Sequence, residues 1–117
     1  MLHGMTLIAM ILSILRIFPR PGIEQNILEV LESLKGPMSS LADFLGASIA
    51  VEVGENGAIC YLERWGSHEA LDRHLCSPLY VRVLEAMECS CRPPEVEFLE
   101  VTGMGGLEMV EKARIVH

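Results

Sequence analysis

The stretch ERWGSHEALDRHLCSP, residues 63–78, decides how the fold is interpreted because it joins a predicted strand to a predicted helix. Side chains alternate along a strand, so Glu63 and Trp65 lie on the same face. In the helix that follows, His74 comes three residues after Leu71, a spacing that places both on one apolar side. We therefore expect these polar and aromatic side chains to meet beneath the helix.

The same stretch contains two helix start signals. Ser67 is a favourable N-cap, and Ser77 is followed by a proline, which the first helical turn accepts. The helical region 67–88 is therefore predicted to form two segments with a bend at Ser77. The predicted apolar face of the second segment consists of Tyr80, Val83, Leu84 and Met87.

Outward from this joint, the hydrophobic periodicity predicts the order β-α-β-β-α-β, which is a ferredoxin-like α+β sandwich. Gly36-Pro37 is predicted to stop the first helix, and Asn56-Gly57 to form a hairpin turn. The expected strands are 10–18, 47–53, 58–65 and 95–102, and the first helix starts at 23. In domain terms we expect an N-terminal extension (1–9), one domain (10–102), and a glycine-rich joint with a short helix (103–117).

Composition indicates that this single domain has a partner. The chain has 117 residues, half of them hydrophobic, and a mean hydropathy of +0.36. Helices cover only one face of such a sheet, yet the strands at 10–18 and 95–102 are apolar on both faces. The sheet of a second subunit is the simplest cover, so we expect a homodimer formed through the sheet face, a dimeric α/β barrel.

Charge excludes several classes of partner. The formal net charge is −7 and the basic residues form no run, so neither a nucleic acid nor an anionic membrane surface is an expected partner. The apolar run 5–15 is far short of the roughly 20 residues that span a bilayer, and we interpret it as a buried strand. The four cysteines include one C-x-C and favour free thiols in a reducing cytoplasm over a metal site.

The polar residues at the joint also have structural explanations. A histidine on an apolar stripe is commonly a hydrogen-bonded core residue, and a tryptophan at a strand end commonly serves packing. Tyr80 can likewise belong to the core. Glu63 is harder to explain in this way, because a carboxylate between Tyr61 and Trp65 must be paired, reach water or carry a raised pKa.

At these residues the chain resembles the antibiotic biosynthesis monooxygenase family, small dimeric α/β-barrel proteins that include quinol monooxygenases. The resemblance consists of the pattern E-x-W-x-S, a leucine, and H-L-x-S-P, and the element order extends it over residues 10–102. The positions that carry it are Glu63, Trp65, Ser67, Leu71, His74, Leu75, Ser77 and Pro78.

The resemblance implies oxidation of a small aromatic molecule or quinol by O₂ without a metal, flavin or haem cofactor. It implies a pocket lined by Trp65 and Tyr61, with Glu63 and His74 as its polar partners, and Tyr80 is a weaker candidate for the pocket. Our hypothesis is that His74 is the proton acceptor and that Glu63 orients it or the substrate. A second hypothesis is a non-catalytic dimeric domain of the same fold that binds a small apolar molecule. The two differ in whether Glu63 and His74 share one cavity or are each satisfied separately.

Overall fold

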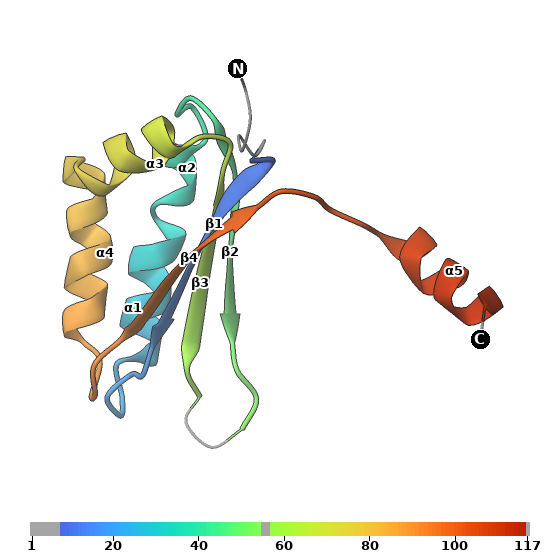
Figure 1. Ribbon diagram of the computed structural model, residues 1–117. Helices are drawn as coiled ribbons and strands as arrows, with labels where there is room; N and C mark the ends of the chain where they lie inside the picture. The colour runs from blue at the N-terminus through green and yellow to red at the C-terminus, as the bar shows by residue number, and fades with distance from the viewer. Residues whose placement is uncertain (1–7, 55–56, 117) are drawn as a thin grey trace.

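The computed structural model describes residues 8–54 and 57–116, which form a four-stranded antiparallel sheet with helices α1–α4 on one face (Figure 1). The strand order is β2-β3-β1-β4, as in a ferredoxin-like fold, so the predicted fold class is confirmed. The strands are β1 (Met10–Ile17), β2 (Phe44–Val51), β3 (Ile59–Trp65) and β4 (Glu95–Val101). The helices are α1 (Glu24–Glu32), α2 (Lys35–Met38), α3 (His68–Leu75), α4 (Pro78–Glu88) and α5 (Leu107–Val116).

Two predicted boundaries differ from the observed ones. Gly36-Pro37 does not end the helical region, because α2 begins at Lys35 and its first turn accommodates Pro37. Strand β2 begins at Phe44 rather than at residue 47, with a register shift next to Gly46, whose φ is +148°. Residues 55–56 of the predicted hairpin turn lie outside the described residues.

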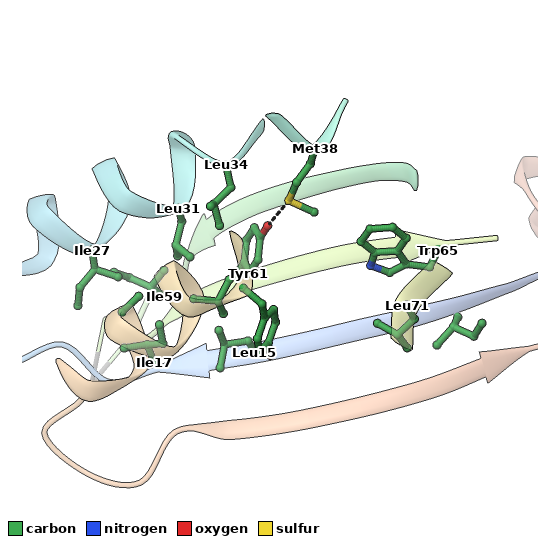
Figure 2. Packing of buried hydrophobic residues seen from close by; sticks show 14 of the residues in the cluster. Leu15, Ile17, Ile27, Leu31, Leu34, Met38, Ile59, Tyr61, Trp65 and Leu71 are labelled. Atoms are coloured by element: carbon green, nitrogen blue, oxygen red, sulfur yellow. Dashed lines mark hydrogen bonds between the residues drawn. The ribbon is translucent and has the colours of Figure 1, made fainter. Parts of the chain in front are cut away.

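The core lies between the inner face of the sheet and the helices (Figure 2). Alternate residues of β1 and β3 are buried. They are covered by the apolar side chains of α1 and α2, which include Ile27, Leu31 and Met38. Ala86 is buried on α4, whereas Leu84, predicted on the apolar face, is 44% exposed. The largest contributors to the core are Ile11, Leu15, Ile17, Ile27, Leu31, Leu34, Met38, Ile59, Tyr61 and Trp65.

The opposite face of the sheet, called here the open face, is covered by none of the helices α1–α4 (Figure 1). Its centre carries four apolar residues from three neighbouring strands, Leu12, Ile14, Leu62 and Leu99, with Arg64 opposite Leu12 and Glu97 opposite Ile14. Towards one end, the guanidinium of Arg16 forms ion pairs with Glu52 and Glu95 at 2.6 and 2.5 Å. A solvated sheet face normally carries polar side chains, so the apolar centre calls for a cover. No described helix is long and apolar enough to cross a membrane.

Candidate functional site

The joint between β3 and α3 fixes the geometry of the site. Ser67 caps α3 by accepting a hydrogen bond from the backbone N–H of Ala70 at 3.2 Å, as predicted from the sequence. Its hydroxyl also donates to the carboxylate of Asp43 at 2.9 Å, which ties the joint to the segment before β2. Because only Gly66 and the cap separate strand from helix, the first two turns of α3 lie over the end of β3.

Glu63 is a buried carboxylate with two hydrogen-bond donors. Its side chain points from β3 towards the helices and is 1% exposed. Oε1 accepts from the indole Nε1 of Trp65 at 2.9 Å, and Oε2 lies 3.1 Å from Nε2 of His74. A buried charge is tolerated only when it is paired and hydrogen-bonded, and here each oxygen has a partner. The expectation that these three residues meet is therefore confirmed.

The hydrogen-bond directions in this cluster follow from chemistry. Indole N–H can only donate, so Oε1 of Glu63 accepts from Trp65. When Glu63 is ionised it can only accept from His74 as well, and Nε2 then carries the proton of that hydrogen bond. In neutral imidazole the other nitrogen, Nδ1, then holds the lone pair. Nδ1 is buried and has no hydrogen-bond partner among the described residues. In that tautomer Nδ1 is the ring nitrogen that remains to accept a hydrogen bond.

Aromatic rings enclose this imidazole. The ring of Trp65 lies 4.8 Å from that of His74 between centroids, at 31°, and Tyr80 meets His74 edge-on at 5.2 Å. Phe44 also packs against the indole, with 5.2 Å between the ring centroids and a tilt of 60°. The surroundings of the imidazole are thus almost entirely apolar, a setting in which each polar contact is strengthened.

A cavity of about 260 Å³ lies next to the pair. Trp65 and His74, which are 1% and 2% exposed, form its inner end, while the exposed Arg73 stands at its mouth. The other lining residues are Leu41, Ala42, Ala70, Ser77, Pro78 and Leu79. The hydroxyl of Ser77 is already engaged, since it donates to the carbonyl of His74 and accepts from the N–H of Tyr80. The cavity is therefore an apolar space with an imidazole inside and a guanidinium at the entrance.

The two tyrosines expected in the pocket lie beside it. Tyr61 is buried in the core and its hydroxyl donates to the sulfur of Met38 at 3.5 Å (Figure 2). Tyr80 contacts His74 from the side, and neither tyrosine lines the cavity. Burial raises the pKa of both phenols, and the Glu63 carboxylate raises them further.

Sequence reasoning missed the residues at the mouth of the cavity. Arg73 could have been found, because Ala70, Arg73, His74 and Ser77 follow the spacing i, i+3, i+4, i+7 of one helical stripe. Leu41 and Ala42 gave no such signal, since they reach the cavity only through the fold of the segment before β2. Among the described residues no group of three His, Cys, Asp or Glu side chains could hold a metal ion.

A ferredoxin-like domain with a buried carboxylate–imidazole pair beside an apolar cavity defines the class of protein. The chain belongs to the antibiotic biosynthesis monooxygenase family, because residues 10–86 match the sequence profile of that family. A comparison with curated proteins found no match.

Solved structures share the fold. The Rv0793 protein of Mycobacterium tuberculosis superimposes with a TM-score of 0.73 at 23% identity, over 83% of this chain and 99% of that one. A conserved protein of Methanosarcina mazei gives 0.72 at 17% identity, over 80% and 94% of the two chains. A variant of SnoaB, a cofactor-independent oxygenase of Streptomyces nogalater, gives 0.68 at 12% identity, over 82% and 96%.

Proposed function

We propose that this protein is a cofactor-independent monooxygenase that oxidises a small phenol or quinol with O₂. The observation that carries the proposal is the buried Glu63–His74 pair beside an apolar cavity, in which Nδ1 of the imidazole has no partner among the described residues. The second hypothesis, a binding domain without activity, expected Glu63 and His74 to be satisfied separately. The two instead pair with each other, and of the two His74 lines the cavity. Family membership and the structural similarity to SnoaB, which is a cofactor-independent oxygenase, give further support.

In the proposed mechanism His74 is the proton acceptor. Nδ1 takes the hydroxyl proton of the bound phenol, and the Glu63 carboxylate stabilises the imidazolium that forms. Trp65 holds Glu63 through its indole N–H and forms the flat inner wall of the cavity. Since His74 is only 2% exposed, the substrate must displace cavity side chains slightly before it contacts Nδ1. Once these side chains have moved, Tyr80 is proposed to contact the substrate. Tyr61 is proposed to lie farther from it.

The substrate itself is the reductant. Once deprotonated, the electron-rich ring transfers electrons to O₂; one oxygen atom enters the product and the other leaves as water, so that phenol and O₂ give a quinone and water. The roles proposed for the protein are to remove the proton and to exclude water from the reactive anion, which the apolar lining favours. A molecule with one aromatic ring or two fused rings matches a cavity of about 260 Å³. This volume is just below the usual range of pockets for drug-sized ligands.

The test is an oxygen-electrode screen of hydroquinones and polyphenols with the wild type and with His74→Ala. We expect oxygen uptake with at least one compound and its loss in the variant, by roughly 10²–10⁴-fold. His68→Ala is the matched control, because His68 lies on the same helix, is exposed, and pairs with the exposed Glu100. Ligand binding seen as a change in Trp65 fluorescence, with no oxygen uptake for any compound, would instead support the binding domain.

We also infer a homodimer in which the open faces of two subunits pack against each other. The apolar centre formed by Leu12, Ile14, Leu62 and Leu99 supports this arrangement, since two such faces bury each other at the usual sheet spacing of about 10 Å. The four cysteines are free, which fits a reducing compartment such as the cytoplasm.

A further inference from the structure

The C-terminal helix α5 lies apart from the rest of the chain. Residues 102–106 lead from the end of β4 to α5, which stands on the side of the sheet opposite to α1–α4 (Figure 1). Every described side chain from residue 107 to residue 115 is exposed. The other elements of the chain therefore do not bury α5.

This helix nevertheless has an apolar side and a defined start. Leu107, Val110 and Ala113 follow one another at intervals of three residues, and Leu107 and Val110 are 70% and 53% exposed. The Glu108 carboxylate accepts a hydrogen bond from the N–H of Gly106 at 2.8 Å. The Met109 side chain occupies the position where residue 105 would carry a Cβ, so it packs directly against Gly105.

The length of α5 requires a packing partner. Isolated helices shorter than about 12–15 residues are marginal in water, and α5 has 10 residues. Its stability must therefore come from burial of its apolar side against another surface. The remaining question is which surface this is.

We propose that α5 is an exchanged arm that docks on a second copy of this chain. This inference rests on the homodimer proposed above and adds to it a contact outside the sheets. The arm stands on the open-face side, where the second copy would pack (Figure 1). Extended, residues 102–106 reach roughly 16 Å, more than the spacing of about 10 Å between packed sheets. The arm can therefore pass the edge of the partner's sheet and place its apolar side against the body of that subunit.

The charges of α5 favour a protein surface over a lipid one. Its described residues carry two acidic side chains, Glu108 and Glu111, and two basic ones, Lys112 and Arg114, so the segment has no net charge. Helices that lie on anionic membranes are rich in Lys and Arg on the polar side. The two apolar anchors and the mixed charges are those of an ordinary interface between subunits.

The first experiment compares dimer dissociation constants by sedimentation velocity over a dilution series, using the full-length chain throughout. Leu107→Gln combined with Val110→Gln removes both anchors with a residue of good helix propensity, so the helix itself is retained. We expect Kd to rise about 100-fold, tenfold for each anchor lost. Lys112→Gln is the control, because Lys112 points away from both Leu107 and Val110 on the helix, and it should leave Kd within about twofold.

The second experiment measures hydrogen exchange of the backbone amides of α5 at protein concentrations above and below Kd. Protection above Kd that disappears below it is the expected result. A dimer whose Kd is unchanged by the double substitution would overturn the arm but leave the sheet-to-sheet dimer intact. If the amides of α5 are protected at all concentrations, α5 docks on its own chain. If they are protected at no concentration, α5 docks on no copy of this protein. Either result overturns the inference. A wild type that stays monomeric overturns the dimer and the arm together.

Discussion

Replacing Glu63 by glutamine should invert the tautomer of His74 and so remove the proposed base without removing the imidazole. The indole of Trp65 can only donate, so the single oxygen of the new side chain would have to face Nε1 of Trp65. The new amide NH₂ would then face Nε2 of His74, which lies 3.1 Å from the second oxygen in the wild type. Nε2 must accept, and the proton moves to Nδ1. The atom proposed to take the substrate proton would become a donor.

The size of the effect follows from the contacts that are kept. Both hydrogen bonds survive Glu63→Gln in neutral form, so we expect unfolding to become easier by no more than about 2 kcal/mol. Turnover, in contrast, should fall by roughly 10²–10⁴-fold, the contribution of a general base. Glu69→Gln is the control, because Glu69 is an exposed carboxylate in the first turn of the same helix.

Two measurements check this prediction. Nitrogen-15 NMR of the imidazole, assigned with His74→Ala, should show the lone pair on Nδ1 in the wild type and on Nε2 in Glu63→Gln. Oxygen uptake, with a quinol found in the screen, should fall in parallel. The reasoning is refuted if Nδ1 already carries the proton in the neutral wild type, or if the inverted tautomer turns over at the wild-type rate.

Three further outcomes follow from the structure. Because the pKa values of Tyr61 and Tyr80 are raised, the folded state binds their protons more tightly than the unfolded state does. The free energy of unfolding should therefore hold its full value below about pH 10 and fall above it, by up to about 1.4 kcal/mol per pH unit for each tyrosine. Denaturant titrations from pH 8 to 11 measure this fall. A free energy of unfolding that stays constant between pH 10 and 11 would contradict this prediction. Leu31→Ala should cost about 2–5 kcal/mol in the same titrations, since Leu31 is fully buried, and a loss below 1 kcal/mol would mean that the core collapses around it. Ser67→Ala should cost about 1 kcal/mol, because it removes the cap of α3 and the hydroxyl contact to Asp43. An unchanged midpoint would show that the backbone hydrogen bond from Gly66 to the carbonyl of Asp43 is enough to hold the joint.

Local rules predicted the parts of the site that are close together in the sequence. Strand alternation placed Glu63 and Trp65 on the buried face, and helical spacing turned His74 towards them, because both periodicities are properties of the backbone. The serine caps were predicted for the same reason, since a cap depends only on residues within one turn.

What local rules missed depends on contacts between distant segments. Strand β2 continues back through Gly46 to Phe44 because pairing with β3 outweighs the poor strand propensity of glycine. Leu84 has the spacing of a core residue, but α4 turns the smaller Ala86 towards α1. The mouth of the cavity combines residues before β2 with residues of α3 and α4, so no single stretch of sequence encodes it.

The fold and the proposed reaction place different demands on the same residues. A buried core at the end of β3 could be filled by leucine with no loss of stability, since replacing a buried charged pair by apolar residues is often neutral or stabilising. The chain instead keeps a carboxylate there, together with an indole and an imidazole that satisfy it. Packing explains Trp65 and Tyr61, but it does not explain His74. One nitrogen of this histidine is hydrogen-bonded to Glu63, and the other has no partner among the described residues. An unsatisfied buried nitrogen costs about 1–3 kcal/mol, and a ligand that donates a proton to it would recover that cost. The proposed binding of a substrate in the cavity therefore accounts for a histidine that the stability of the fold does not explain.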